Sequence, residues 1–458
     1  MNSKFKYYFL LLTFLVSWSA SSQELYEGTL TTLKVGLELN AADGKALLYI
    51  PEQGLFAHDI QNPVFRNDSL IADLKAFNTV LTGKISDNTF DGSWKQNGYG
   101  MPLKLQKVAS LSFLRRPQHP APPYPDAVED VKFTNVDKSI TFGGTFTYPS
   151  INYPLTTVIL ISGSGQQDRD ETIFGHKPFW VLADHLSRNG FAVLRVDDRG
   201  VGQTTGAVGT SADYAKDVLA AMAYLKTRKE VNPRKIGLIG HSEGGVIAPM
   251  VAQESKQVAF MVSLAGVGVK GYDLLLQQND DMLKKTGVGE AFREYYRSLN
   301  SALYDVILRN SLENDLKDSL QIAFDNWLQK QPDAVLGQMG FKSEIGKKSV
   351  TRQFDTLNSK WYRYFLKYDP QPVLAHLKIP VLALNGGSDL QVSAKENLRG
   401  FEKGLQAAGN KNFKIVELAG LNHLFQKCQK CTVAEYGLLE ETFSTEALDL
   451  ITDWLKKQ

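Results

Sequence analysis

The sequence has few of the features that mark specialised classes of protein. Only two of its 458 residues are cysteines, Cys428 and Cys431, so no framework of disulfides holds the fold together. Neither sign of charge is in excess: 51 lysines and arginines stand against 49 aspartates and glutamates. Without Lys4 and Lys6, which lie in the leader described below, the net charge is zero. Proteins that bind nucleic acid through its phosphates carry a basic excess, so no nucleic-acid partner is predicted.

Long hydrophobic runs are also missing. Past residue 22, no stretch reaches the roughly 18 apolar residues that a membrane-spanning helix needs, so no stable membrane insertion is expected. The content of 43% hydrophobic and 22% charged residues is ordinary for a globular protein. At roughly 150 residues per domain, the chain has room for two or three domains. No pattern in it predicts an oligomeric state.

Residues 1–22 have the three parts of a secretory signal peptide. Two lysines precede a short apolar run, and small residues follow it. Ala20 and Ser22 suit the −3 and −1 positions of a cleavage site, so Gln23 is the expected first residue of the mature chain. The apolar run is too short to span a bilayer of about 30 Å. We therefore expect an exported protein, either periplasmic or secreted.

Residues 24–110 alternate apolar and polar positions in the manner of β-strands. Asp-Gly and Asn-Gly turns punctuate the segment. The expected strands are Thr29–Asn40, Ala46–Ile50, Leu81–Ser86 and Met101–Val108. The pattern predicts a small all-β domain, either an antiparallel sandwich or a half-barrel. It holds no nucleophile and no cluster of ligand-type side chains, which favours a packing or shielding role over carbohydrate or lipid binding.

Residues 111–126 are rich in proline. Five of the 17 prolines in the chain lie between Arg115 and Asp126. This density favours extended polyproline II structure and excludes a helix or a central strand. We expect a semi-rigid linker and a domain boundary here.

Residues 127–458 alternate apolar strands with helical patterns, which predicts an α/β domain with a doubly wound, mainly parallel sheet. The expected strands are Thr157–Ile161, Ala192–Val196, Ile236–Ile239, Phe260–Ala265, Val381–Leu384 and Lys414–Leu418. The alternation stops at about 267–376, where a helix-rich stretch with many aromatic residues stands between two strands. An insertion of this length is more typical of a helical cap than of a loop. Functional side chains in such sheets gather at the carboxyl ends of the strands.

The strongest motif is Gly240-His241-Ser242-Glu243-Gly244, a G-x-S-x-G sequence between an apolar strand and a helical pattern. Glycines flank the serine because the sharp strand-to-helix turn leaves no room for Cβ atoms. The serine then projects above the sheet. We predict Ser242 as a nucleophile and expect His241 to point elsewhere on the turn.

A serine hydroxyl needs a base to take its proton and a carboxylate to orient that base. His423 lies in a loop at the carboxyl end of a strand-like run and is the predicted base. His176, in a loop that could reach the site, is the weaker alternative. Asp389 follows the preceding apolar strand at the same edge and is the predicted carboxylate. The chain order Ser242, Asp389, His423 differs from the orders of chymotrypsin and subtilisin.

The oxyanion of a tetrahedral intermediate needs two backbone N–H donors. Glu243, directly after the nucleophile, is one predicted donor. The other is expected from the Ser-Gly-Ser-Gly stretch after the strand that ends at Ile161, where we choose Ser164, with Gly165 as the alternative. The sequence predicts neither a cofactor nor a metal.

Four stretches together resemble the α/β-hydrolase superfamily, and within it the exported esterase branch of serine-aminopeptidase-like proteins. They are Gly163–Glu171, Asp197–Gly202, the Ser242 elbow and Asn422–Gln426. The resemblance implies hydrolysis of carboxylic esters without a cofactor, and it places the catalytic triad on the three residues named above. Within the first stretch, Asp168, Arg169 and Asp170 are expected to fix the loop by pairing with one another. A direct role of Arg169 in substrate binding is the alternative.

The preferred function is that of a serine esterase, which cleaves a small-molecule ester through an acyl-enzyme. The alternative is an aminopeptidase, or an acyl transferase or thioesterase, with the same triad. An exopeptidase would need a carboxylate in the cap to hold the substrate's α-ammonium group, and Glu290 and Glu313 are candidates. A non-catalytic binding protein is disfavoured because the triad is intact.

Cys428-Gln429-Lys430-Cys431 lies just past His423. A C-x-x-C sequence can be a redox site, half of a zinc site or a small disulfide. The chain has no second pair of cysteines, and export leads to an oxidising compartment. We therefore predict a local disulfide that braces the histidine loop, ahead of two free thiols or a metal site.

Overall fold

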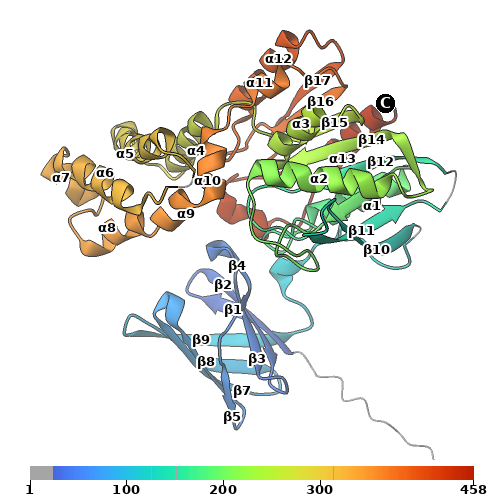
Figure 1. Cartoon of the computed structure of the whole chain (residues 1–458). Helices are drawn as coiled ribbons and strands as arrows, with labels where there is room; N and C mark the ends of the chain where they lie inside the picture. Colours follow the sequence, from blue (N-terminus) through green and yellow to red (C-terminus); the bar gives the residue numbers. More distant parts are fainter. Residues whose placement is uncertain (1–23, 125, 151–152, 313) are drawn as a thin grey trace, which may run out of the picture. The chain divides into compact units, whose positions relative to one another are not determined.

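The computed structural model describes residues 24–124, 126–150, 153–312 and 314–458. The predicted signal peptide, residues 1–22, lies outside them. The described residues form two compact units, the first ending at Ser112 and the second beginning at Phe113 (Figure 1). No helix in these ranges is both long enough and apolar enough to cross a membrane.

The first unit is a single antiparallel sheet of nine strands in the order β4-β3-β2-β1-β9-β8-β7-β6-β5. The strands are β1 (Glu24–Leu30), β2 (Leu33–Asn40), β3 (Lys45–Ile50), β4 (Leu55–Asp59), β5 (Val64–Arg66), β6 (Ser69–Leu74), β7 (Thr79–Ile85), β8 (Thr89–Gln96) and β9 (Tyr99–Val108). The first and last strands pair in the middle of the sheet. Alternate side chains such as Leu37, Leu81 and Phe90 point into one apolar core. This is the predicted all-β domain, in its half-barrel form.

One strand predicted in this unit is wrong. Thr29–Asn40 is not a single strand but parts of the hairpin of β1 and β2, in which Leu30 pairs with Leu33. Thr31 turns the chain with a φ of 56°. A β-branched residue seldom adopts this left-handed conformation, so the residue type carries no sign of the turn.

The second unit is built on an eight-stranded sheet in the order β10-β11-β13-β12-β14-β15-β16-β17. The strands are β10 (Ala127–Thr134), β11 (Thr141–Tyr148), β12 (Leu155–Ile161), β13 (Ala192–Val196), β14 (Val231–His241), β15 (Val258–Leu264), β16 (Val381–Gly386) and β17 (Phe413–Leu418). β10 and β11 form an antiparallel edge, and the six strands from β13 to β17 run parallel. The central strands are almost continuously buried, which explains their unbroken apolar runs. The predicted doubly wound, mainly parallel sheet is confirmed.

Helices cover both faces of this sheet. They are α1 (Pro178–Arg188), α2 (Ser211–Leu225), α3 (Gly244–Glu254), α12 (Ala394–Ala407) and α13 (Thr445–Leu455). α2, α3 and α12 contribute to one apolar core, and α1 and α13 to a second. The carboxyl ends of the strands are left for the loops that carry the polar residues.

The cap is a contiguous insertion between β15 and β16 (Figure 1). Its helices are α4 (Gly271–Lys285), α5 (Glu290–Arg309), α6 (Lys317–Gln329), α7 (Asp333–Gln338), α8 (Glu344–Thr351), α9 (Phe354–Asn358) and α10 (Lys360–Lys367), and the short α11 (Gln371–Leu374) leads back to the sheet. The cap has its own apolar core, which includes Leu303, Phe324 and Trp327. At its base the N–H of Gly271 donates to the carbonyl oxygen of Tyr368 at 2.9 Å, so the first and last turns of the cap meet.

The proline-rich segment contacts the rest of the second unit through the two side chains that flank its first proline, Pro117. Gln118 Oε1 accepts from the backbone N–H groups of Thr442 and Phe443, at 2.6 and 3.0 Å. Arg116 donates to the carbonyl oxygens of Phe174 and Gly437, at 3.1 and 2.8 Å. From Phe113 onward, the residues predicted as a linker therefore belong to the second compact unit.

Candidate active site

Ser242 lies in the turn between β14 and α3 with a φ of 53°. The residues two positions before and after Ser242 have to be glycine, because the surrounding backbone lies too close for a Cβ atom. A Cβ atom on Gly240 would lie 2.0 Å from the carbonyl oxygen of Gly244, and one on Gly244 would lie 2.1 Å from that of Ile161 in β12. The serine N–H donates to the carbonyl oxygen of Leu264 in β15 at 2.8 Å. The turn is thus the strained strand-to-helix elbow that the motif predicts.

Asp389 follows β16 and His423 follows β17, so the two neighbouring parallel strands bring both residues to one edge. His423 Nδ1 donates to Asp389 Oδ2 at 2.7 Å, and both side chains are buried. Asp389 Oδ1 accepts from the backbone N–H groups of Gln391 and Val392, at 2.7 and 2.9 Å. These bonds hold the carboxylate and select the histidine tautomer with its proton on Nδ1, so Nε2 is the basic nitrogen.

Ser242 and His423 line one pocket of about 280 Å³. The cap contributes Leu274, Leu275 and Gln278 from α4, and Trp361, Tyr362 and Phe365 from α10. Among the described residues, Ser242 Oγ has no hydrogen-bond partner. Serine–histidine contacts of this kind often tighten only in the reacting complex. The structure thus brings the predicted nucleophile and the predicted histidine–aspartate pair around one cavity.

The predicted oxyanion donors lie at this cavity and in the elbow. Ser164 lines the pocket, and Glu243 follows the nucleophile. Within the described part of the chain, neither backbone N–H donates to another residue. Gly165, the alternative, is not part of the pocket lining and has a φ of 100°. The N–H of Gly163 is already used, because it donates to Glu171 Oε1 at 2.7 Å.

The expected mutual pairing of Asp168, Arg169 and Asp170 is wrong. Arg169 donates instead to Asp197, at the end of β13, at 2.7 Å. Asp170 forms an ion pair with the buried Arg195 of β13. The Asp168 carboxylate accepts within the loop, from the backbone N–H groups of Asp170 and Thr172 and from Thr172 Oγ1. The Arg169 guanidinium is neutralised by Asp197 and does not line the pocket.

His176, the weaker candidate for the base, does not line the pocket. It is fully buried, with Nδ1 2.9 Å from Thr442 Oγ1 and Nε2 3.0 Å from the carbonyl oxygen of Tyr436. Burial lowers the pKa of His176 to about 3, and the nearby Arg116 acts in the same direction. His176 is therefore a neutral structural group that packs against the segment of Tyr436 and Thr442.

Sequence reasoning missed a second buried pair, Glu171 and His241. His241 does not point away from the site: its ring lies 4.8 Å from the His423 ring, centre to centre. Its Nδ1 is 2.8 Å from Glu171 Oε1, and its Nε2 is 3.0 Å from the carbonyl oxygen of His423. Burial lowers the pKa of His241, but the Glu171 carboxylate outweighs it and holds the value above normal. Because Glu171 also accepts from Gly163, the pair joins the oxyanion loop, the elbow and the histidine loop.

A partly buried carboxylate, Asp198, holds the loop of the predicted oxyanion donor Ser164. It accepts from Ser162 Oγ at 3.0 Å and from the backbone N–H of Gln167 at 2.9 Å. Burial raises the pKa of Asp198 to about 7, against the effect of these two bonds. The loop that carries Ser164 is therefore tied at both ends to one side chain.

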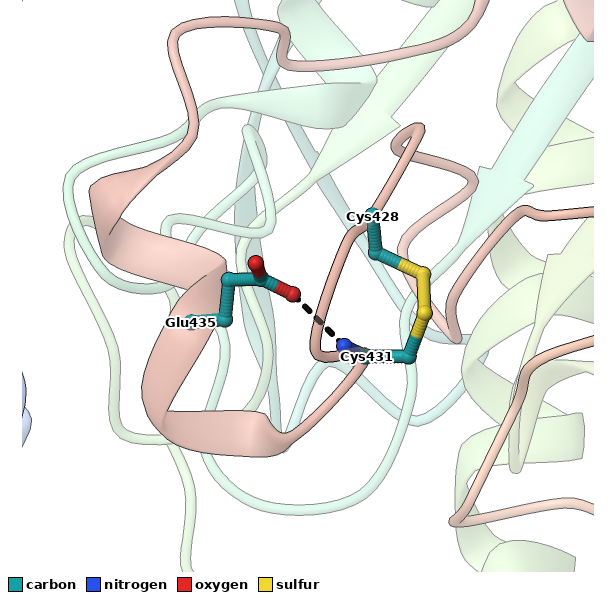
Figure 2. Close-up of side chains that lie close together, drawn as sticks. All are labelled: Cys428, Cys431 and Glu435. Atoms are coloured by element: carbon teal, nitrogen blue, oxygen red, sulfur yellow. Dashed lines mark hydrogen bonds between the residues drawn. A yellow bond between two sulfur atoms is a disulfide. The ribbon is translucent and has the colours of Figure 1, made fainter.

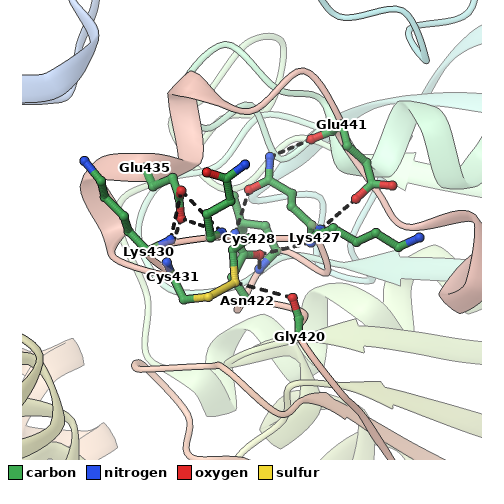
Figure 3. The surroundings of a disulfide bond; sticks show 11 residues. Gly420, Asn422, Lys427, Cys428, Lys430, Cys431, Glu435 and Glu441 are labelled. Atoms are coloured by element: carbon green, nitrogen blue, oxygen red, sulfur yellow. Dashed lines mark hydrogen bonds between the residues drawn. A yellow bond between two sulfur atoms is a disulfide. The ribbon is translucent and has the colours of Figure 1, made fainter.

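Cys428 and Cys431 form a disulfide, as predicted (Figure 2). The Glu435 carboxylate accepts from the backbone N–H groups of residues 429–431, the shortest bond being 2.6 Å to Cys431. The disulfide closes a small ring of residues 428–431. On the other side of this ring, Cys428 Sγ contacts the carbonyl oxygen of Gly420 at 3.4 Å (Figure 3). Gly420 lies three residues before His423, so the ring packs against the start of the histidine loop.

These two cysteines and Glu435 also form a group of ligand-type atoms close enough together to hold a metal ion. With the sulfur atoms bonded to each other, neither is the thiolate that binds a metal. Glu435 is occupied by the backbone donors of the same loop. The arrangement fits a structural brace.

A family model described as the alpha/beta hydrolase fold matches residues 156–420, more than half of the chain. The chain belongs to the α/β-hydrolase fold family. The matched range runs from β12 through the elbow and Asp389 to the end of β17, and stops three residues before His423.

One similar protein is Esterase EstD of Thermotoga maritima, which is 27% identical over 357 residues, covering 77% of this chain and 74% of the relative. The solved structure of the Pyrococcus furiosus esterase Pf2001 has a TM-score of 0.44 and 15% identity, over 72% of this chain and 93% of that chain. The α/β-hydrolase GrgF from Penicillium has a TM-score of 0.42 and 19% identity, over 72% and 98%.

Proposed function

We propose that this α/β-hydrolase is a carboxylesterase with Ser242, His423 and Asp389 as its catalytic triad. The observation that carries the proposal is the 2.7 Å bond between His423 and Asp389 beside a pocket that Ser242 also lines. The 27% identity with an esterase over most of the chain supports the reaction class.

The mechanism follows from these positions. Ser242 Oγ attacks the ester carbonyl carbon while His423 Nε2 takes the hydroxyl proton. The N–H groups of Ser164 and Glu243 stabilise the oxyanion, and each such donor contributes ~2.7–4 kcal/mol. His423 then gives its proton to the leaving alcohol, which leaves the acyl group on Ser242. Water attacks the acyl-enzyme with His423 again as the base, and the acid is released.

The pocket lining favours an ester over a peptide amide with a free amino terminus. Among the described residues that line it, Glu171 is the one carboxylate, and it is occupied by His241 and Gly163. An α-ammonium group would find no other carboxylate there. Of the two candidates in the cap, Glu290 is not part of the lining, and Glu313 lies outside the described residues.

The test is intact-mass analysis after reaction with a fluorophosphonate, which labels activated serines. We expect a single adduct on the wild type and none on Ser242→Ala, followed by hydrolysis of ester substrates ahead of aminoacyl amides. A folded wild-type protein that forms no adduct would refute the proposal. An adduct that persists in Ser242→Ala would place the nucleophile elsewhere.

We also propose that the enzyme is exported and that Gln23 is its mature N-terminus. The leader-type sequence of residues 1–22 supports this, and so does the disulfide of Cys428 and Cys431, since disulfides persist in oxidising compartments. Fractionation of the producing cells, with the intact mass of the recovered protein, tests it. A cytosolic protein that retains residues 1–22 would overturn it.

A further inference from the structure

The side chain of Glu243 joins the elbow to the cap. Its carboxylate is 1% exposed and accepts from Ser211 Oγ at 2.5 Å, at the start of α2. Both of its oxygens also lie 2.9 Å from Nε1 of Trp361, on the cap helix α10. Burying a carboxylate is costly unless donors satisfy it, so this contact is specific rather than incidental.

Trp361 forms part of the apolar wall of the pocket. Its ring stacks on Phe365, with centroids 5.9 Å apart and planes 19° apart, and meets Tyr362 edge-on at 6.0 Å. All three rings line the cavity. An indole that is hydrogen-bonded at Nε1 and stacked on one face has little freedom to rotate, so the wall has a fixed position.

Glu243 therefore contributes both to the proposed oxyanion site and to the position of the pocket wall. The backbone N–H of Glu243 is a proposed oxyanion donor, and its side chain holds Trp361 of the aromatic wall by a direct hydrogen bond. Apart from the catalytic histidine and the Glu171–His241 pair, the described lining carries no charged side chain. A neutral, apolar ring is the kind of group that such a wall accommodates.

We propose that Trp361, held by Glu243, is a specificity-determining residue that selects neutral esters with an aryl group. The proposal rests on the esterase function above and adds its substrate class. The aryl ring packs on the indole, and the hydrogen bond to Glu243 keeps the indole at a fixed distance from the reacting carbonyl.

The experiment compares kcat/KM for ethyl phenylacetate and benzyl acetate with that for ethyl acetate, by pH-stat. The aryl preference is the larger of the two ratios. We expect at least a tenfold aryl preference in the wild type, which falls about tenfold in Trp361→Phe because the ring loses its anchor. The matched control is Trp327→Phe. It removes an equivalent indole hydrogen bond, 2.9 Å to Ser298 Oγ, inside the cap and outside the pocket lining, and it should keep the preference.

A second pair of variants separates the anchor from the size of the ring. Glu243→Gln keeps an acceptor for Trp361 and should keep the aryl preference within about threefold, whereas Glu243→Leu removes the acceptor and should lose the preference about tenfold. Both variants keep the Trp361 side chain and the backbone N–H of residue 243.

The outcomes are distinct. An adduct with the fluorophosphonate but no aryl preference in the wild type refutes the substrate class and leaves the esterase function standing. An unchanged preference in both Trp361→Phe and Glu243→Leu refutes the role of the anchor. Absence of an adduct refutes the esterase function, and with it this inference.

Discussion

The pocket has two halves that are held in place by different forces. The strand-end half consists of the loops after β12, β14, β15, β16 and β17, and buried polar contacts such as His423–Asp389 and His241–Glu171 fix it. The cap half consists of the pocket-lining residues of α4 and α10, which apolar contacts hold in place. Leu275 and Tyr362 pack on the apolar core of the cap, whereas Leu274 and Phe365 pack with residues of the hydrolase unit. The hydrogen bond between Glu243 and Trp361 is a polar contact that joins the two halves.

The difference suggests that the two halves contribute to different kinetic properties. Charge develops on the reacting atoms, which meet the strand-end half, and interactions that strengthen in the transition state act on kcat. The cap half meets the parts of the substrate that do not react, and contacts of this kind act on the choice of substrate. Substitutions in the two halves should therefore have different kinetic signatures.

The largest effect is expected for Asp389→Asn in the strand-end half. The amide can donate to His423 Nδ1 and so favours the wrong tautomer, which should lower kcat by on the order of 10⁴-fold. Steady-state kinetics on a simple ester checks this. A loss of less than tenfold, in a variant with wild-type circular dichroism, would contradict the role of Asp389.

The next effect concerns stability at acid pH and depends on His176. Burial holds its pKa at about 3 in the folded state, against an ordinary value of 6.5. Between these values the unfolded chain binds a proton that the folded chain does not, so His176 costs stability as the pH falls. His176→Asn removes this cost but also removes the hydrogen bonds of the ring, so we expect the variant to be less stable than the wild type at pH 8. This deficit in the free energy of unfolding should shrink by about 1.4 kcal/mol per pH unit below pH 6.5.

Urea titrations of both proteins at pH 8, 6 and 4.5 measure this deficit. The value at pH 8 reports the hydrogen bonds that the substitution removes, because titration does not contribute there. If the deficit is the same at all three pH values, His176 is not the group responsible.

A smaller effect is expected for Glu171→Gln. The amide still accepts from Gly163 but no longer pairs as a charge with His241, so the oxyanion and histidine loops are held less firmly. Misplacement of reacting groups costs up to roughly 10²-fold, and we expect kcat to fall 10- to 10²-fold with little change in KM. A change confined to KM would contradict the positioning role and would indicate that Glu171 binds substrate.

The smallest effect is expected in the cap half, for Leu275→Ala. The residue lines the pocket but has no group that can take part in proton transfer, and one trimmed apolar contact is worth about 1–3 kcal/mol in discrimination. We expect KM for an aryl ester to rise several-fold while kcat stays within about twofold. If kcat falls as much as in Glu171→Gln, the two halves do not differ in their kinetic effects.

The strand-end half could be predicted from the sequence because its positions follow from the topology. Once the apolar strands are recognised, the residues after them have to meet at one edge, and Ser242, Asp389 and His423 do so. The contacts between loops could not be predicted. His241 and Glu171 are 70 residues apart, and Trp361 and Glu243 are 118 residues apart. No local pattern records such a meeting.

The all-β unit shows a second limit. Its class was predictable, but β4, β5, β6 and β8 were missed. β8 reads Thr-Phe-Asp-Gly-Ser-Trp-Lys-Gln and buries only Phe90 and Trp94. Antiparallel strands with one exposed face tolerate polar residues and glycine, so the apolar alternation becomes too sparse to recognise.

The hydrogen bond between Gly271 and Tyr368 at the base of the cap has an evolutionary consequence. Because the chain leaves the hydrolase unit and returns to it at nearly the same point, the intervening helices form a cassette. A cassette with adjacent ends can be lengthened, shortened or exchanged without rerouting any strand, since closing a loop of different length changes the free energy only slowly. Recombination at this single junction could give the same catalytic machinery a new substrate range, and chimeras made there are the natural starting point for redesign.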